Sequence, residues 1–297
     1  MFVDAIEKIN AFTRPIHTIS RLYESDEVIP GASTLFFVNE LGYAITCRHV
    51  AELIAQADAI NSRHKEIALE ILKLSRKKGF NGKKKEIEKK YSVNKSCVTQ
   101  IKNTFINCVD SMSEFKIEAH PTEDVAIISF VGFSQLPYTG HAVFLKNSSK
   151  IKQGQSLCRL GYPFPEFSNF TYDKENDDIL WTSEGKPITP SFPIDGIVTR
   201  NVLGENNKVT GIEVSTPGLR GQSGGPLFDQ RGVIYGMQSS THHLHLGFDI
   251  KDGEIRENGK IRKISNYPFL HLGRSVHVDV IKDFLKEKGV KFYESED

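Results

Sequence analysis

The sequence predicts an all-β protein, built either as a sandwich or as a pair of barrels. Short apolar or alternating runs recur along the 297 residues, and each is bounded by Gly, Pro, Asn or Asp. Sustained helical patterns appear mainly in two segments, 61–91 and 278–288. Because a chain of this length can form one large all-β unit, we expect mostly strands, with a helical insertion and a C-terminal helix.

The first 27 residues are interpreted as an N-terminal arm. Met1–Arg21 carries charges throughout and lacks the run of about 7–15 apolar residues that a secretory signal has. No stretch of the sequence reaches the roughly 18 apolar residues of a membrane helix. Ala5–His17 fits either a short helix or an ordered arm, and no association with a membrane is expected.

Residues 28–148 are predicted to form the first β unit. Gly31–Val38 and Gly42–Cys47 are β-rich runs joined by a turn at Asn39–Gly42. One or two helical turns are expected at Val50–Ala55, directly after the second run. Further strands are expected at Cys108–Met112, Phe115–Ala119, Asp124–Phe130 and Ala142–Phe144.

Residues 61–91 differ in kind from their surroundings. Ile67 and Ile71 lie among charges in a helix-compatible pattern, and a lysine-rich stretch interrupted by Gly79–Gly82 follows. We interpret the segment as an inserted helical hairpin or a flexible loop. It is either a solvated face balanced by nearby glutamates or a docking surface for an acidic partner or nucleic acid. The second alternative depends on charges such as those of Lys83, Lys84 and Lys85.

Residues 149–297 are predicted to form the second β unit. The segment 164–193 is rich in aromatic, proline and acidic residues, and we expect a long surface loop, which in a compact domain is usually functional. An amphipathic stripe at 278–288 predicts a helix packed on the body. Strands are expected at Ser156–Leu160, Asp195–Arg200, Val209–Val214, Pro226–Phe228, Gly232–Met237 and Leu244–Ile250.

Charge and cysteine content narrow the expected partners and the expected cellular compartment. Lys plus Arg number 38 against 37 Asp plus Glu, so no overall charge indicates a nucleic acid or a membrane surface. The four cysteines show no C-x-x-C spacing and are typical of reduced thiols in a cytoplasmic protein, with a Cys97–Cys108 disulfide as the alternative. His242, His243 and His245 are interpreted as exposed histidines at a pocket rim, with zinc binding as the alternative. No metal or cofactor is expected.

Gly221–Pro226, with the sequence GQSGGP, contains the first candidate for chemistry. A serine hydroxyl becomes a useful nucleophile only when a base takes its proton and nearby donors receive the developing oxyanion. Glycines beside Ser223 permit a sharp turn that can point backbone amides at that charge. Alone, the same residues are also compatible with an ordinary β-turn.

His49 and Asp124 supply the other two groups. The β-rich run Ala44–Cys47 leads to His49 at the junction of a strand and a helix, where an imidazole can be held in place. Asp124 leads into the apolar run Val125–Ile128, where a carboxylate needs a partner. An imidazole N–H is such a partner, and the bond leaves the other ring nitrogen free to act as a base.

These blocks, in the order His, Asp, Ser, resemble the trypsin-like (chymotrypsin-fold) serine proteases, and most closely the HtrA/Deg-type branch without a PDZ domain. The family patterns T-x-x-H, D-[IVL]-A and G-[ND]-S-G-G-P correspond to blocks around His49, Asp124 and Ser223. Leu160–Pro163 and Gly196–Arg200 resemble two further family segments. The resemblance covers about residues 28–290, apart from the two insertions.

The resemblance implies two Greek-key six-stranded β-barrels, residues 28–148 and 149–297, with the site between them. His49 and Asp124 would come from the first barrel and Ser223 from the second. The backbone N–H groups of Gly221 and Ser223 would form the oxyanion hole. Ser223 would attack a peptide carbonyl, with His49 as general base and then general acid, through an acyl-enzyme.

Two positions depart from the secreted members of the family. Val50 stands where they have a cysteine, which agrees with an intracellular setting. Gln222 replaces the aspartate that receives a newly cut N-terminus, so activation in the manner of trypsin is not expected. The residues expected to line the substrate pocket are Pro217 at its floor and Gln238, Ser239 and Thr241 on its walls.

The absence of an acid at the expected floor argues against cleavage after Lys or Arg. Thr241 in place of a glycine favours a small aliphatic side chain before the scissile bond, whereas Gln238 would offer hydrogen bonds to a polar one. The predicted function is a serine endopeptidase, intracellular and regulated by a partner or signal. It would act on a protein or peptide, with regulators docking at 61–91 or 164–193. The alternatives are a catalytically silent module that binds peptides or partners, and a nucleic-acid-binding protein that uses the basic insertion.

Overall fold

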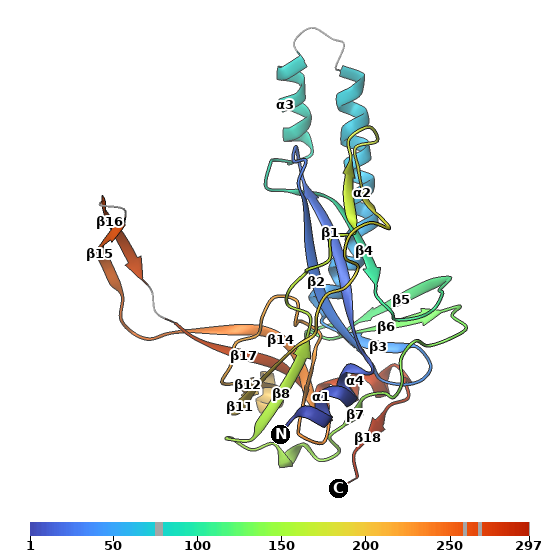
Figure 1. Ribbon diagram of the computed structural model, residues 1–297, viewed down its shortest axis with the longest axis vertical. Helices are drawn as coiled ribbons and strands as arrows, with labels where there is room; N and C mark the ends of the chain where they lie inside the picture. The colour runs from blue at the N-terminus through green and yellow to red at the C-terminus, as the bar shows by residue number, and fades with distance from the viewer. Residues whose placement is uncertain (75–79, 258–259, 267–268, 297) are drawn as a thin grey trace.

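The structure is a computed structural model, which describes every residue except 75–79, 258–259, 267–268 and 297 (Figure 1). Two large β-sheets form the body, and strands clearly outnumber helices. The predicted all-β class with two barrel-like units is therefore confirmed. The C-terminal helix α4 (Val278–Glu287) also lies where it was expected.

The first sheet has six strands in the order β4-β1-β2-β3-β6-β5. Neighbouring strands are antiparallel throughout, as expected for a sheet built from hairpins and short connections. The strands are β1 (Thr13–Leu22), β2 (Val28–Phe37), β3 (Tyr43–Thr46), β4 (Val98–Phe105), β5 (Glu114–Ala119) and β6 (Ala126–Val131).

The second sheet closes on itself. Six of its strands follow the order β13-β8-β11-β12-β17-β14, and a pairing between β14 and β13 completes the ring. Two short strands, β7 (Val143–Phe144) and β18 (Tyr293–Glu294), extend the sheet to eight by parallel pairing beyond β14. The ring strands are β8 (Ser156–Gly161), β11 (Phe192–Leu203), β12 (Val209–Val214), β13 (Pro226–Phe228), β14 (Val233–His245) and β17 (Phe269–His277).

A continuous hydrophobic core joins the two sheets. Phe36 from the first sheet packs near Phe144 from the second, with ring centroids 6.5 Å apart, and both side chains are fully buried. The apolar faces of α4 and of α1 (Val3–Asn10) cover the same core, through Ile281 and Ile9. Two short 3-10 helices, Ser148–Lys150 and Glu205–Asn207, complete the body.

The interpretation of residues 1–27 as an N-terminal arm was wrong. These residues form α1 and β1, and β1 lies between β2 and β4 in the first sheet. Its strand pattern was hidden because polar residues such as His17 and Arg21 are buried together with Ile16 and Ile19. Hydrophobicity alone therefore underestimated how much of this strand belongs to the interior.

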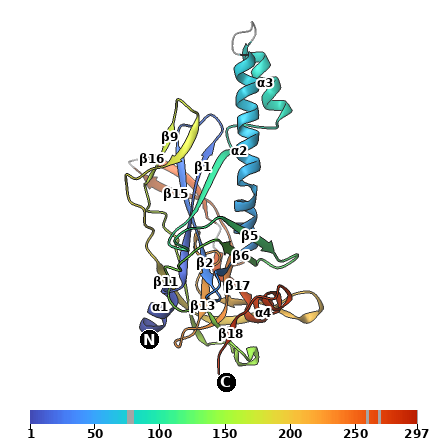
Figure 2. The same ribbon diagram turned by 90° about the vertical axis from the view of Figure 1, so that its right-hand side faces the viewer.

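The helical insertion is larger than predicted. Helix α2 starts at Arg48, next to His49, and continues to Leu74, so the expected one or two turns at Val50–Ala55 were too short. It forms a hairpin with α3 (Phe80–Lys90) that rises away from the sheets (Figure 2). Helical patterning was weak because the hairpin is largely solvated, with a small apolar contact made by Tyr23, Ile67 and Ile87.

Polar contacts hold the middle of α2 against the edge strand β4. Asn61 donates from Nδ2 to the carbonyl of Ile101 at 2.8 Å and accepts from the Ile101 amide at 2.9 Å. One turn later, the buried His64 ring lies 2.7 Å from Thr99 Oγ1 and 3.0 Å from Asp177. These contacts satisfy backbone groups at the sheet edge that would otherwise be open.

The segment 164–193 is an ordered part of the fold and not a plain loop. It contains a hairpin of β9 (Phe170–Asp173) and β10 (Asp178–Trp181), and Phe167 and Ile179 pack on Ile19 of β1 in a separate small core. The short strands were missed because acidic residues occupy the turn between them. Asp177 then pairs with Arg21 at 2.5 Å, which joins this segment to the first sheet.

Three further expectations need correction. Cys108–Met112 is not a strand, because the chain turns there before β5 begins at Glu114. The alternative of a Cys97–Cys108 disulfide was also wrong, since all four cysteines are free. Leu244–Ile250 is not one strand, because β14 ends at His245 and a further hairpin follows.

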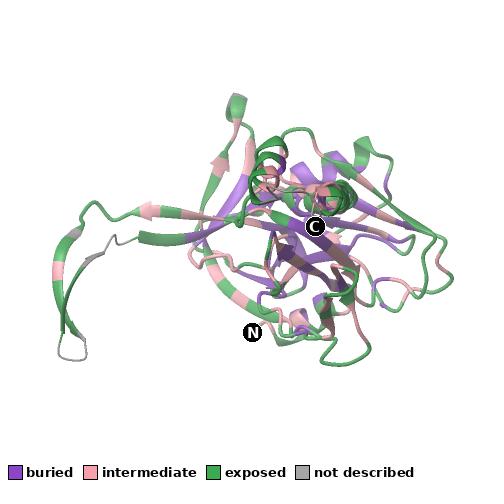
Figure 3. Ribbon diagram, turned by 90° about the horizontal axis from the view of Figure 1, so that it is seen from above, coloured by how far each residue is buried: buried purple, intermediate pink, exposed green. Residues whose placement is uncertain are grey.

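That hairpin, β15 (Ile250–Glu257) and β16 (Lys260–Asn266), extends outward from the body on the ends of β14 and β17 (Figures 1 and 3). Figure 3 shows that its described residues are mostly exposed. Among the helices within the described ranges, none combines the length and apolar character needed to cross a membrane.

Candidate active site

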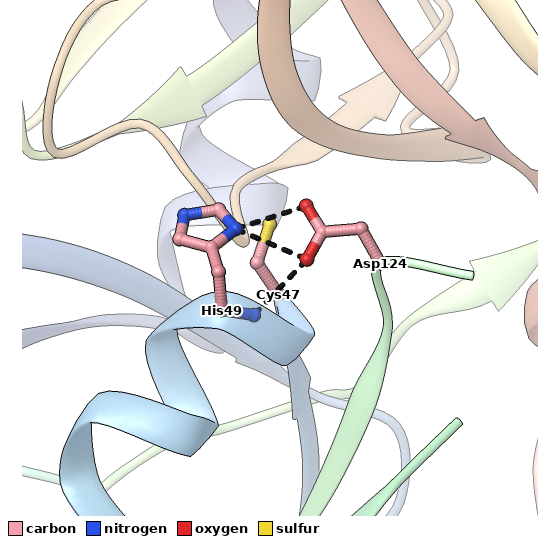
Figure 4. Close-up of side chains that lie close together, drawn as sticks. All are labelled: Cys47, His49 and Asp124. Atoms are coloured by element: carbon pink, nitrogen blue, oxygen red, sulfur yellow. Dashed lines mark hydrogen bonds and ion pairs between the residues drawn. The ribbon is translucent and has the colours of Figure 1, made fainter. Parts of the chain in front are cut away.

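Sheet register brings His49 and Asp124 together. Thr46 at the end of β3 pairs with Ala126 at the start of β6, so the residues just beyond these strand ends are neighbours. His49 Nδ1 lies 3.0 Å from each carboxylate oxygen of Asp124, and the His49 backbone N–H also donates to that carboxylate at 3.1 Å (Figure 4). The carboxylate thereby fixes both the ring and the first turn of α2.

Each member of this pair favours the charged form of the other. The hydrogen bond that His49 donates to Asp124 is the largest influence on His49 and raises the pKa of its imidazole above the usual value, although burial opposes it. Burial is the largest single influence on Asp124 and opposes ionisation. Hydrogen bonds from His49 and Ser239 outweigh it, and the pKa of Asp124 falls to about 2. Near neutral pH, Asp124 is therefore an anion that can orient and stabilise a protonated imidazole.

Ser239 is a second fixed partner of Asp124. Its Oγ donates to Asp124 Oδ2 at 2.5 Å. The sequence suggested only a pocket-wall position for Ser239, and no local signal separates this serine from its neighbour Ser240. Its role becomes visible only when β14 of the second sheet lies against the start of β6.

Ser223 lies in the loop between β12 and β13, which both sheets hold in place. Its carbonyl accepts from the Thr34 amide in β2 at 2.9 Å, and the next amide, of Gly224, donates to Gln238 in β14 at 2.9 Å. Gly221 and Gly224 have φ of +91° and +87°, and a Cβ at either would collide with backbone, of Tyr162 and Thr34 respectively. Both positions therefore require glycine.

The loop leaves two amides available near Ser223. Among the hydrogen bonds of the described residues, neither the Gly221 amide nor the Ser223 amide donates to a protein acceptor. The other face of Gly221 is fixed, since its carbonyl accepts from Thr34 Oγ1 at 2.7 Å. Two unused N–H donors on a rigid turn are what an oxyanion site requires.

The Ser223 hydroxyl is hydrogen-bonded to a backbone carbonyl in this structure. Its Oγ donates to the carbonyl of Ser239 at 3.3 Å, and no hydrogen bond to His49 is present within the described chain. Ser239 therefore contacts both halves of the site, Asp124 through its hydroxyl and Ser223 through its carbonyl. The structure joins His49 to Asp124 and places Ser223 beside Ser239, which is bonded to Asp124.

A cavity of about 460 Å³ adjoins Ser223. Its lining includes every residue expected there, namely Pro217, Gln238, Ser239 and Thr241. Thr241 does not simply narrow the opening, because its hydroxyl donates across the wall to the Gly218 carbonyl at 2.7 Å. The sequence did not single out three basic residues that also line the cavity, which are Arg220, His243 and His271.

The three clustered histidines diverge. His242 lies 3.2 Å from Glu213, His243 lies 2.6 Å from His271, and His245 lies 2.5 Å from Asp249. Successive strand residues point to opposite faces, so adjacent histidines do not converge on one ion. Of His242, His243 and His245, only His243 lines the cavity beside Ser223.

Cys47 joins His49 and Asp124 in the one group of potential metal ligands found in the described ranges (Figure 4). Cys47 is fully buried, its Sγ donates to the Gln238 carbonyl at 3.2 Å, and burial raises the pKa of its thiol well above the usual value. A thiol held in its protonated form is a poor metal ligand. The group fits a hydrogen-bonded support for the imidazole better than a metal centre.

Comparisons with known proteins identify the family of this chain. The model of the trypsin-like peptidase domain matches residues 33–237, a span that contains His49, Asp124 and Ser223. Among curated proteins, none matches. Solved structures with a similar arrangement include a serine-to-alanine variant of the HtrA-type protease AlgW with a tripeptide, at 13% identity and a TM-score of 0.47.

The same protease with a tripeptide and with a decapeptide gives 14% and 13% identity, each with a TM-score of 0.46. The three alignments cover 97–98% of this chain. This chain spans only 63%, 65% and 67% of theirs. The family match extends over more than half of the chain, and the protein therefore belongs to the family of trypsin-like peptidase domains.

Proposed function

We propose that this protein is a serine endopeptidase in which Ser223, His49 and Asp124 form the catalytic triad. The observation that carries the proposal is the His49–Asp124 pair, bonded at 3.0 Å, whose partner Ser239 lines the same cavity as Ser223. A base whose tautomer is fixed by a carboxylate, together with a serine on a glycine-shaped turn, is the arrangement that acyl transfer needs.

In the first half of the reaction, the Ser223 Oγ bonds to the peptide carbonyl carbon while its proton passes to His49 Nε2. The amides of Gly221 and Ser223 hold the oxyanion, and collapse of the intermediate breaks the C–N bond as His49 donates its proton to the leaving amine. In the second half, water takes the place of the departed amine, and its oxygen bonds to the acyl carbon as His49 accepts one of its protons. The bond between Ser223 Oγ and the acyl carbon then breaks as His49 returns a proton to Oγ. This leaves a carboxylic acid and the free enzyme.

The reaction requires one local movement. Ser223 Oγ must leave the Ser239 carbonyl, 3.3 Å away, and turn toward His49. The position of a serine hydroxyl is set by the single torsion χ1, and rotation about that bond changes its partner. This requirement supports regulation by a substrate, partner or signal that favours the turned position. The four free cysteines support a reducing compartment such as the cytoplasm.

Covalent labelling tests the proposal directly. A fluorophosphonate probe should label the full-length protein once, at Ser223, and labelling should be lost in both Ser223→Ala and His49→Ala, since triad members act as a unit. Ser240→Ala is the matched control and should label normally. A correctly folded wild type that neither labels nor cleaves peptides would instead indicate a peptide-binding module without catalysis.

A further inference from the structure

An arginine is buried directly beneath the cavity beside Ser223. Arg159, in β8, is 1% exposed and is the largest of the fully buried side chains in the described structure. Its Nη2 donates to the carbonyls of Thr216 and Pro217 at 2.7 Å, and Pro217 is the expected pocket floor. Its Nη1 donates to Gln238 Oε1 at 3.1 Å, on the cavity wall. The floor and one wall of the cavity therefore rest on a guanidinium group.

Among the residues that the structure describes, this guanidinium has no anionic partner. Its acceptors are two carbonyls, the Thr216 hydroxyl and the Gln238 amide oxygen, and its Nε has no acceptor among the described residues. No carboxylate within the described ranges forms an ion pair with it. Burial lowers the pKa of Arg159 to about 10, so it remains charged at neutral pH. A buried charge without a counter-ion is costly, and proteins rarely retain one without a use.

The fold makes space for this charge. A Cβ at Gly273 in β17 would collide with Arg159 Nη1, so a glycine at this position leaves room for the guanidinium. The nearby acid Glu213 is already engaged, since its carboxylate bonds to Arg200 at 2.9 Å and to His242 at 3.2 Å. The carboxylate of Glu213 is therefore already paired with other residues.

The cavity itself has one permanently positive side chain in its lining, that of Arg220. Its lining contains three basic residues and no Asp or Glu. The basic residues are Arg220, His243 and His271. Gln238 separates the cavity from Arg159, with Oε1 toward the guanidinium and Nε2 donating to the Ser240 carbonyl at 2.8 Å. An anion entering the cavity would meet N–H donors, supported from behind by a positive charge in a low-dielectric setting.

We propose that this cavity accepts an acidic side chain, Glu or Asp, of the substrate residue that precedes the scissile bond, and that Arg159 supplies the charge that selects it. The proposal rests on the proposed protease function. It differs from the small aliphatic preference expected from Thr241 alone, and it extends the alternative in which Gln238 bonds a polar side chain. Arg159 acts here as a specificity-determining residue, and Gln238 transmits its polarity to the cavity.

Peptide substrates that differ only before the scissile bond provide the first test. With the full-length protein, kcat/KM should be at least about tenfold higher for Glu or Asp than for the isosteric Gln or Asn, because an unpaired buried charge discriminates strongly between them. Lys should be the poorest residue. Equal or higher kcat/KM for Ala or Val than for Glu would overturn the proposal.

Gln238→Glu is the sharper test, because it places a carboxylate about 3 Å from Arg159 at almost unchanged volume. The internal ion pair should remove the Glu-over-Gln preference. Gln153→Glu, an exposed change outside the cavity lining, is the matched control and should keep the preference. Retention of the wild-type preference in Gln238→Glu would contradict the role of Arg159.

Binding separates this inference from the proposed function. Product peptides ending in Glu or Gln can be titrated into Ser223→Ala by fluorescence polarisation, a measurement that needs no turnover. Tighter binding of the Glu product, reduced by Gln238→Glu, supports a pocket that accepts acidic side chains, even if the wild type cleaves nothing. Equal binding of the two products overturns the pocket proposal, even if fluorophosphonate labels Ser223.

Discussion

The two halves of the candidate site are built in different ways. His49 lies just after the end of β3 and Asp124 just before the start of β6, so the register between Thr46 and Ala126 already sets their 3.0 Å contact. Ser223 lies on a turn held by Thr34 from one sheet and Gln238 from the other. The base is therefore positioned by local geometry, whereas the nucleophile depends on contacts between distant parts of the chain. Loss of those contacts should affect the nucleophile first.

Removing the negative charge of Asp124, in the half of the site that strand register positions, should have the largest effect. Asp124→Asn keeps the size of the side chain but alters the tautomer and orientation that it imposes on His49. We expect kcat to fall by roughly 10⁴-fold with the fold intact. Single-turnover peptide cleavage and circular dichroism check this result. Asp283→Asn, at an exposed helix position, is the control, and near-normal kcat in Asp124→Asn would contradict the assignment of the triad.

Thr34→Val should show how far the nucleophile half depends on the other sheet. The Thr34 hydroxyl donates to the Gly221 carbonyl at 2.7 Å and accepts from the Tyr162 amide at 3.2 Å. Its loss leaves two buried groups unpaired, which costs about 1–3 kcal/mol of stability. We expect about a 10–100-fold loss of kcat/KM, because the turn beside Ser223 relaxes.

Urea unfolding and peptide kinetics measure the two effects of Thr34→Val separately. Thr18→Val, which removes a hydroxyl bonded to Asn103 elsewhere in the first sheet, is the matched control. It should reduce stability without a comparable loss of activity. If both variants lose the same fraction of activity, the turn does not depend specifically on Thr34.

The pH dependence of cleavage reports the ionisation of His49 in its pair with Asp124. His49 must be neutral to act as a base, and Asp124 raises the pKa of its imidazole above 6.5. Below that raised pKa, kcat/KM should fall about tenfold for each pH unit. Asp124→Asn removes the anion, so the residual activity should lose its acid limb only at lower pH. An acid limb that does not move would exclude His49 as the titrating group.

Ser239→Ala should give the smallest change. It removes one of the donors to Asp124, which raises the pKa of that carboxyl, but His49 remains bonded to it. We expect about a 3–10-fold loss of kcat, consistent with the loss of one supporting hydrogen bond. Peptide kinetics beside the neighbouring variant Ser240→Ala check this, and a loss as large as that in Asp124→Asn would refute the ranking.

Sequence patterns predicted the elements that obey simple periodicity or carry chemical motifs. The strand Val209–Val214 and the helix near 278–288 were confirmed almost to the residue. The region β1 was missed because its buried His17 and Arg21 are polar, and their partners come from distant segments. Arg159 was missed for the same reason. Within its strand it is one charged residue among apolar ones, and only tertiary packing shows that it has no counter-ion.

Helix α2 connects the active site with the exterior in one continuous rod. Its 27 residues span about 40 Å, and His49 lies at its first turn. The bonds of Asn61 and His64 clamp the rod to the sheet roughly 20 Å along its length. A force on α3 or on the outer end of α2 therefore acts beyond the bonds of Asn61 and His64. These bonds resist the movement before it reaches the imidazole of His49. Displacement of α3 or of the outer turns of α2 is therefore expected to leave His49 in place.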